Sequence, residues 1–388
     1  MPHFNPLVER LSPPPVPSVL AWGKAYDGSR GPLIDLSQAV PGYPPHPDML
    51  AWLAEAAGSR TYTGYGAIEG EDDLRTAFAT HVSDLYGADI GAENIHITSG
   101  CNQAFISVAV AIAGAGDTIV MTNPFYFNQE TTLSMLGIGT RLVDCDPVQG
   151  FLPDLAAIEA ALQPGVRAIA LVSPNNPTGA VYPPELLTAI AALCKKSGTW
   201  LILDETYRDF LPEGQRPHGL FTGEGWQDTV IGLYSFSKSF CIPGHRLGAI
   251  TAGERLVEQV TKIMDNLQIC APRSAQAALA KALPVLDDWR NGNRAEIGRR
   301  SDTMKATMAR VSGWRIEAIG AYFAFIRHPF PGRSSADIAE RLAKEAGIVC
   351  LPGDYFGEGQ GDYLRFAFAN AGSDTIAKLE ERLAGFTG

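Results

Sequence analysis

Between Asn94 and about residue 284, short apolar runs alternate with longer stretches of helical character. Seven of these runs are predicted to be strands, at residues 95–98, 118–122, 140–143, 168–172, 200–203, 230–234 and 247–251. This alternation predicts an α/β fold whose large, mostly parallel sheet is flanked by crossover helices. The nearly continuous apolar character of the runs suits strands that are buried on both faces. Because ligands of such sheets bind beyond the carboxyl ends of the strands, we expect the functional residues there.

The last third of the sequence has a different pattern of predicted helices and strands. Residues 287–312 form a long polar stretch of helical character, and strands are expected at 320–327, 348–351 and 363–369, with helices at 336–346 and 373–383. Residues 1–17 are rich in proline, which cannot occupy a helix interior, so an extended arm lying on a partner subunit is expected. We therefore predict an arm (1–17), a large domain (46–284) and a smaller α+β domain made of residues 18–45 and 285–388.

Composition excludes several classes of protein. The net charge of −11 argues against non-specific binding to nucleic acid or to an anionic membrane surface. The six cysteines are scattered without a C-x-x-C pair, which argues against a disulfide scaffold or a zinc site and favours a reducing, cytoplasmic location. No signal-peptide pattern is found, and the longest apolar run, near residues 105–113, is too short to span a bilayer. No metal site is predicted.

The most informative stretch is Ser235-Phe-Ser237-Lys238, which comes after an apolar strand and precedes Arg246 by eight residues. A lysine amine can condense with an aldehyde, while hydroxyl groups and a guanidinium can hold a phosphate. Lysines in serine-rich stretches are nevertheless more often solvated surface residues, and short motifs give many false matches. The assignment therefore depends on the residues at the ends of the other strands.

Two strand ends offer groups for a phosphate and a planar ring. The strand at residues 95–98 is followed by a turn into a helix that contains Gly100, Cys101 and Asn102. A helix N-terminus can bind a phosphate, although such a turn can also be an ordinary helix cap. After residues 118–122, Tyr126 can stack on a ring or belong to the core.

The remaining strand ends carry an amide and a carboxylate. The turn that contains Asn176 comes after residues 168–172, and Asp204 and Tyr207 come after residues 200–203. A carboxylate at the end of an apolar strand is costly unless it is paired, and a protonated ring nitrogen would serve as its partner. Further along the chain, Arg365 lies within an aromatic strand, where it would pair with a carboxylate of the protein or of a substrate.

In this order and spacing the motifs resemble the class I/II aminotransferases, fold-type I enzymes that use pyridoxal 5'-phosphate, and the resemblance covers roughly residue 33 to the C-terminus. It implies that Lys238 forms a Schiff base with the cofactor and moves the proton, and that Asp204 pairs with the pyridine nitrogen. It also implies that Arg365, with Asn176 and the loop at Ala39, binds the substrate. The other implied cofactor contacts come from Gly100, Cys101, Asn102, Tyr126, Asn176, Tyr207, Ser235, Ser237 and Arg246, with Asn176 and Tyr207 on the ring hydroxyl.

The resemblance also implies a partner and a reaction. Tyr65 matches a tyrosine that reaches the phosphate of the neighbouring subunit, so a homodimer with shared sites is expected. Ala39 and Cys101 stand where relatives often have other small residues, which affects the substrate mouth and the phosphate contacts. The implied activity is ping-pong transfer of an amino group from an L-amino acid to a 2-oxo acid.

Three questions stay open at this point. A carbon–sulfur β-lyase or another lyase with the same cofactor would use the same residues, and a ligand-sensing domain without catalysis is a more distant alternative. Arg273 is a candidate for binding a side-chain carboxylate. Neutral or aromatic amino acids are favoured if a set of aromatic side chains lines the pocket, namely Trp22, Tyr26, Tyr43, Tyr234, Tyr322 and Phe323.

Overall fold

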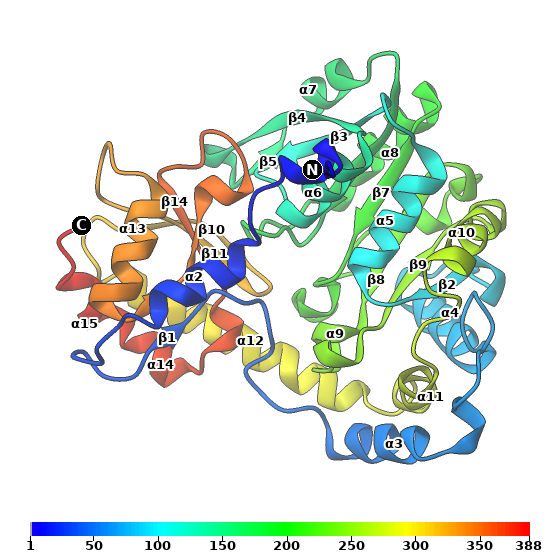
Figure 1. Ribbon diagram of the computed structural model, residues 1–388, viewed down its shortest axis with the longest axis horizontal. Coiled ribbons are helices and arrows are strands. Elements are labelled where there is room, and N and C mark those ends of the chain that lie inside the picture. The colour runs from blue at the N-terminus through cyan, green and yellow to red at the C-terminus, as the bar shows by residue number, and fades with distance from the viewer. Residues whose placement is uncertain (1) are drawn as a thin grey trace.

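The computed structural model describes residues 2–388, and its larger part is built on an eight-stranded sheet (Figure 1). The strand order is β2 (Ile95–Thr98), β9 (Gly248–Thr251), β8 (Val230–Ser235), β7 (Trp200–Asp204), β6 (Val166–Val172), β3 (Thr118–Asn123), β4 (Gly139–Asp146) and β5 (Leu152–Pro153). The seven predicted strands are all present, and the short edge strand β5 was not predicted. The pairs from β8 through β4 are parallel, whereas β9 runs antiparallel to both β8 and β2.

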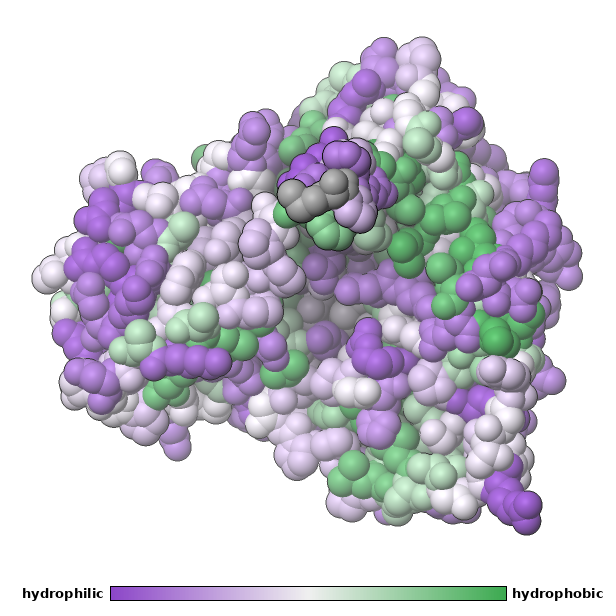
Figure 2. Space-filling model, viewed as in Figure 1, coloured by the Kyte–Doolittle hydropathy of each residue, from purple (hydrophilic) through white to green (hydrophobic). Residues whose placement is uncertain are grey.

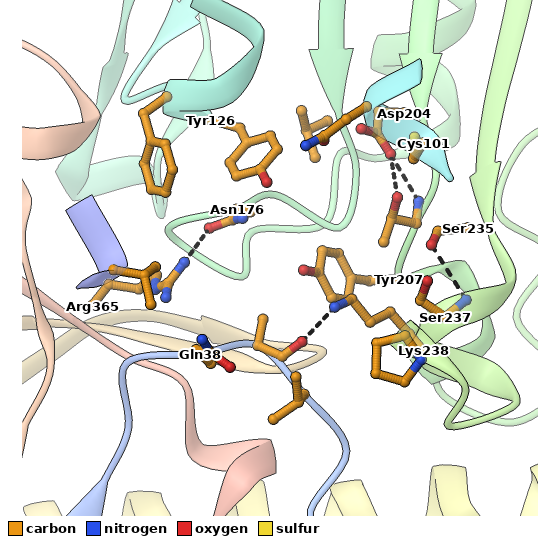
Figure 3. A pocket seen from close by; sticks show the side chains of 18 of the residues that line it. Gln38, Cys101, Tyr126, Asn176, Asp204, Tyr207, Ser235, Ser237, Lys238 and Arg365 are labelled. Carbon is orange, nitrogen blue, oxygen red and sulfur yellow. Dashed lines mark hydrogen bonds between the residues drawn. The ribbon is translucent and has the colours of Figure 1, made fainter. Parts of the chain in front are cut away.

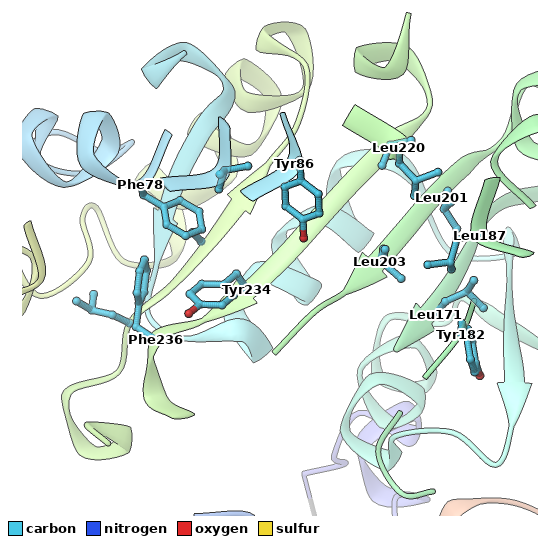
Figure 4. Packing of buried hydrophobic residues seen from close by; sticks show 14 of the residues in the cluster. Phe78, Tyr86, Leu171, Tyr182, Leu187, Leu201, Leu203, Leu220, Tyr234 and Phe236 are labelled. Atoms are coloured by element: carbon cyan, nitrogen blue, oxygen red, sulfur yellow. The ribbon is translucent and has the colours of Figure 1, made fainter. Parts of the chain in front are cut away.

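Successive residues of a strand point to opposite faces of the sheet, so these apolar strands place side chains on both faces. Helices cover both of these faces. In β7, Leu201 and Leu203 pack into one core cluster, whereas Ile202 packs into another. The first face is covered by α4 (Asp72–Tyr86), α7 (Leu155–Ala161), α8 (Pro184–Ser197) and α11 (Arg273–Ala282), and Figure 4 shows part of this packing. The second face is covered by α5 (Cys101–Ile112), α6 (Phe127–Leu136) and α10 (Glu254–Leu267).

The second large sheet has four antiparallel strands and is formed by the C-terminal third. Its order is β10 (Arg315–Gly320), β11 (Phe323–Arg327), β14 (Tyr363–Phe366) and β13 (Leu351–Pro352). Nearby, β1 (Ile34–Asp35) pairs in parallel with β12 (Ile348–Val349). The surrounding helices are α12 (Asp287–Met308), α13 (Ser335–Arg341), which continues as a π-helical turn (Leu342–Ala346), α14 (Ser373–Ala377) and α15 (Leu379–Ala384).

Four expectations for this region need correction. The strand expected at 348–351 is divided between β12 and β13, which belong to different sheets, and the helix expected at 373–383 is divided between α14 and α15. The strand expected at 320–327 begins only at Phe323, because Gly320 ends a separate strand, β10, that the sequence reading missed. The strand expected at 363–369 ends at Phe366. The half-buried, mixed polar and apolar pattern of β10 carries little strand signal by itself, and its pairing with β11 supplies what the local sequence lacks.

The N-terminal segment is not an extended arm throughout. It contains a short helix, α1 (Pro6–Glu9), and a second helix, α2 (Pro15–Gly23), and both begin with a proline. Proline suits the first helical position because the N–H that it lacks would have no partner within the helix. The segment lies near α6 of its own chain, where Arg10 donates a hydrogen bond to the carbonyl of Ser134 at 3.5 Å (Figure 1).

The chain then continues into α3 (Pro47–Ala57), which packs on α11 (Figure 1). Across residues 2–388, none of the helices combines the length and the apolar character needed to cross a bilayer.

Candidate active site

The polar residues at the strand ends meet in one cavity of about 270 Å³ (Figure 3). On the face drawn in Figure 2, the molecule is hollowed near its centre, between the parts built on the two sheets. Twelve of the predicted site residues line the cavity: Ala39, Cys101, Asn102, Tyr126, Asn176, Asp204, Tyr207, Ser235, Ser237, Lys238, Arg246 and Arg365. The carboxyl ends of β6, β7 and β8 therefore converge as the parallel sheet predicts.

Asp204 lies at the end of β7 and is only 5% exposed. Its Oδ1 accepts hydrogen bonds from the backbone N–H and the hydroxyl of Thr206, at 3.0 and 2.7 Å. Its Oδ2 accepts one from Nε2 of Gln129 at 2.9 Å. Burial raises the pKa of Asp204, and within residues 2–388 no cationic side chain forms an ion pair with it. The site thus presents a buried acid that a protonated ring nitrogen would complete.

Neither Thr206 nor Gln129 was predicted from the sequence. Thr206 had a usable signal, because an aspartate side chain often accepts a hydrogen bond from the backbone N–H two residues on in an Asx-turn. Gln129 gave none, since it lies in α6 and reaches Asp204 only through the packing of that helix against the sheet.

Lys238 lies in α9 (Phe236–Ser239), the single helical turn directly after β8. Its Nζ donates a hydrogen bond to the carbonyl of Ala39 at 2.5 Å. Burial, reinforced by the positive charges of Arg246 and Arg365, lowers the pKa of Lys238 to about 8. A larger fraction of this amine is therefore unprotonated and nucleophilic near neutral pH than for a solvated lysine.

The other end of the cavity suits a phosphate. Arg246 is held by the carbonyls of Pro243 and Ser99, at 3.0 and 3.4 Å, beside the N-terminus of the twelve-residue helix α5. Gly100 precedes that helix with φ +88°, and a Cβ there would clash with Nη2 of Arg246. The buried hydroxyl of Ser237 has no hydrogen-bond partner in the described part of the chain. Free donors, a guanidinium and a helix N-terminus together match an anion.

Arg365 lies in β14 and faces the cavity from the smaller sheet. Its Nη1 donates to Oδ1 of Asn176 at 3.0 Å, and another nitrogen donates to the carbonyl of Ser37. Its buried Nε has no hydrogen-bond partner among the residues that the structure describes. Within residues 2–388 no carboxylate forms an ion pair with Arg365. Burial lowers its pKa to about 10, so the guanidinium remains charged at neutral pH. It is therefore available to a carboxylate from outside the chain.

Two phenols border the same cavity. The hydroxyl of Tyr126 accepts a hydrogen bond from Nδ2 of Asn128 at 2.8 Å. Burial raises the pKa of Tyr126 to about 12 and raises the pKa of Tyr207 well above its usual value. Both groups are thus protonated at neutral pH and can donate hydrogen bonds to a ring substituent.

Tyr65 does not line the cavity of its own chain, and the residue is 80% exposed. The loop that carries it is held by Arg273, which pairs with Glu71 at 2.7 Å and donates to the carbonyls of Thr61 and Gly64, at 3.0 and 3.2 Å. Arg273 is thus committed to this loop and does not face the cavity, which is against a role in binding a side-chain carboxylate in this chain.

The structure also answers the open question of an aromatic lining. None of Trp22, Tyr26, Tyr43, Tyr234, Tyr322 and Phe323 lines the cavity, and Tyr234, Tyr322 and Phe323 are buried in the core clusters. The apolar wall consists instead of Val16, Val40, Phe127, Val172 and Pro243.

Comparisons with known proteins agree with this geometry. An aromatic aminotransferase of Arabidopsis thaliana is 29% identical over 342 residues, which is 86% of this chain and 84% of that protein. A valine–pyruvate aminotransferase of Mycobacterium tuberculosis is 29% identical over 381 residues, 96% of each chain. A Thermus thermophilus aspartate aminotransferase double mutant has the same fold, with a TM-score of 0.90 at 24% identity over 99% of both chains. The family model for aminotransferase class I and II matches residues 31–383, so the chain belongs to this family of aminotransferases.

Proposed function

We propose that this aminotransferase moves an amino group from a neutral or aromatic L-amino acid to a 2-oxo acid by a ping-pong mechanism. The observation that carries the proposal is the meeting of Lys238, Asp204 and Arg365 in one cavity. These residues supply a nucleophilic amine, a buried acid and a guanidinium, and among residues 2–388 neither the acid nor the guanidinium has a partner of opposite charge.

The cavity fits the family's cofactor, pyridoxal 5'-phosphate. We infer that Asp204 would hold the ring nitrogen, Tyr207 and Asn176 the ring hydroxyl, and Tyr126 a face of the ring. The phosphate would bind to a cradle formed by Gly100, Cys101, Asn102, Ser235, Ser237 and Arg246. When bound, the cofactor supplies an aldehyde and an electron sink for the charge left by proton removal.

The residues of the chain supply position and proton transfer. Lys238, with its pKa lowered to about 8, would hold the aldehyde end of the cofactor, and its Nζ would take the α-proton of the amino acid. Arg365 and Asn176 would hold the α-carboxylate and thereby fix the direction of the Cα–H bond. Asp204, held by Thr206 and Gln129, would keep the ring nitrogen protonated.

The preference for neutral or aromatic side chains rests on the cavity wall. Val16, Phe127 and Val172 contribute apolar surface, and the lining residues contain no cation besides Lys238, Arg246 and Arg365 within the described part of the chain. Each of these three has a proposed role in binding the cofactor or the α-carboxylate. A second acidic group on the substrate would therefore lack a partner from this chain.

We further propose a homodimer in which Tyr65 of each subunit reaches the phosphate of the other site. The exposed Tyr65 on a loop fixed by Arg273 supports this arrangement. A cytoplasmic location is proposed because all six cysteines are free thiols.

We also propose two domains, residues 46–284 and residues 18–45 with 285–388, since the two larger sheets share no strand. The expected end of the arm at residue 17 falls inside α2 (Pro15–Gly23), so we move it to residue 14.

The test is a panel of amino donors mixed with the cofactor-loaded protein in the absence of any acceptor. Loss of the aldehyde-form absorbance with neutral and aromatic donors, and its return on adding a 2-oxo acid, would support the proposal. Production of pyruvate and ammonia without an acceptor would identify a lyase instead. Lys238→Ala should abolish both the absorbance and turnover, and normal transamination by that variant would remove Lys238 from its role.

A further inference from the structure

A buried chain of polar contacts runs from the turn that carries Lys238 to helix α12. Ser239, the residue after Lys238, has its Oγ 2.7 Å from the hydroxyl oxygen of Tyr234. The Tyr234 hydroxyl donates to Oδ2 of Asp209 at 2.5 Å, and Nη1 of Arg290 lies 3.6 Å from Oδ1 of the same carboxylate. The hydroxyl of Tyr234 has one proton, which it donates to Asp209. Ser239 is therefore the donor in its hydrogen bond with Tyr234.

The charges around this chain fix its hydrogen-bond directions. Burial alone would raise the pKa of Asp209, but the positive charges of Arg290 and Arg208 outweigh it and lower that pKa. Asp209 is therefore an anion that can only accept. The neighbouring His81 has a pKa lowered to about 4 by burial and by the same two arginines, so it is neutral at pH 7.

The ring of Tyr234 is held as firmly as its hydroxyl. It stacks on Phe78 with ring centroids 5.3 Å apart, and the guanidinium carbon of Arg208 lies 4.2 Å from its centroid. Figure 4 shows Tyr234 packed beside Phe78 and Phe236 in the core of the large sheet. Its hydroxyl is thus a fixed point to which a neighbouring group can be tied.

The turn that carries Lys238 has few bonds of its own. Helix α9 spans only Phe236–Ser239, so its internal hydrogen bonds cannot set its position. One side is bonded through the Lys238 carbonyl, which accepts from the Tyr322 hydroxyl at 3.4 Å. The other side is bonded through Ser239 to Tyr234.

We propose that Tyr234 is a positioning residue for Lys238: its hydroxyl, anchored by Asp209, holds Ser239 and with it the helical turn that presents the lysine amine to the cavity. Tyr234 does not line the cavity, so it acts only through this turn. The inference rests on the catalytic role proposed for Lys238. The charged or titratable groups that act on Lys238 directly are Arg246, Arg365 and Cys101, and a change at Tyr234 alters none of them.

The test compares Tyr234→Phe and Ser239→Ala, which each remove one hydroxyl, with the double variant. The control is Tyr182→Phe, which removes another buried hydroxyl, bonded to Thr122 at 3.3 Å, from the same core cluster. Two quantities are measured: kcat and KM of the loaded enzyme, and the pH midpoint of acylation of Lys238 in the cofactor-free protein by peptide mass spectrometry. Thermal unfolding confirms that each variant is folded.

We expect each single variant to lower kcat about tenfold, because each loses roughly one buried hydrogen bond. KM should stay within about twofold of the wild-type value. The double variant should be no worse than the poorer single one, because both break the same chain. A loosened turn exposes the Lys238 amine to water. The pH midpoint of its acylation should therefore rise from about 8 toward the ordinary lysine pKa of 10.5. Tyr182→Phe should leave both quantities unchanged.

An unchanged midpoint and kcat in Tyr234→Phe would overturn the proposal. So would a normal Ser239→Ala beside an impaired Tyr234→Phe, because Tyr234 would then act through core packing alone. If the wild type fails to transaminate but the midpoint still rises in both single variants, the proposed function falls while the positioning role of Tyr234 stands.

Discussion

Replacing Lys238 by methionine should stabilise the cofactor-free protein at neutral pH. The folded state lowers the pKa of Lys238 from 10.5 to about 8, chiefly by burial. At about 1.4 kcal/mol per pKa unit, the folded protein carries a cost of about 3 kcal/mol for the charged amine. The lysine is protonated in both states below pH 8, so the whole cost is present at pH 7. Methionine has a similar length and no charge, and its substitution removes this cost.

The pH dependence isolates this effect from the packing change. Between pH 8 and 10.5 the unfolded chain holds the Lys238 proton more tightly than the folded protein does, so the stability contributed by wild-type Lys238 rises with pH. The advantage of Lys238→Met should therefore shrink from about 3 kcal/mol at pH 7 to about 1 kcal/mol at pH 10.

Urea unfolding of the cofactor-free protein at the two pH values measures this change. Lys196→Met, at a lysine whose side chain is 74% exposed, is the matched control and should show no pH-dependent difference. An advantage of Lys238→Met that is equal at both pH values, or a less stable variant at pH 7, would refute the reasoning.

Three further predictions concern the proposed contacts. Asp204→Ala should keep some cofactor but lower kcat by about 100-fold or more, and wild-type turnover would refute the pairing with the ring nitrogen. Arg365→Ala should raise KM about 10- to 100-fold for the amino acid and the oxo acid alike, and a response by only one of them would contradict its carboxylate role. Gly100→Ala should raise the Kd for pyridoxal 5'-phosphate about tenfold, measured by absorbance titration, because the added Cβ would displace Arg246. Gly116→Ala has a similar φ of +92° but no atom within 4 Å of its Cβ, and should leave this Kd unchanged.

The parts of the fold and site that the sequence predicted are those governed by local pattern. Strands such as β7 and β8 are apolar over most of their length, because they are buried on both faces, and Asp204 and Lys238 lie at or just after their ends. Parallel strands place these ends at one edge, so the convergence of the polar residues could be expected from the pattern alone. The order of the motifs then indicated the family, which the comparison over residues 31–383 confirmed.

The features that the sequence could not supply depend on contacts between distant segments. Gln129 approaches Asp204 through helix packing, and Arg273 is drawn to Glu71, 202 residues away. The sequence left open whether Tyr322 and Phe323 line the pocket or belong to the core, and the structure buries both in the core, where large rings contribute more to stability. The prolines of the N-terminal segment were read as helix breakers, although a proline at the first helical position favours a helix.

The antiparallel course of β9 has a consequence for how the two ends of a bound molecule would be held. Because β9 reverses direction after β8, Lys238 and Arg246 belong to one hairpin whose register is set by the pairing of Ser235 with Gly248. Their separation is thus a property of a single continuous piece of chain. Arg365 belongs to the other sheet. A sliding movement of one sheet against the other would therefore displace Arg365 from the substrate carboxylate, while Lys238 and Arg246 kept their separation around the cofactor.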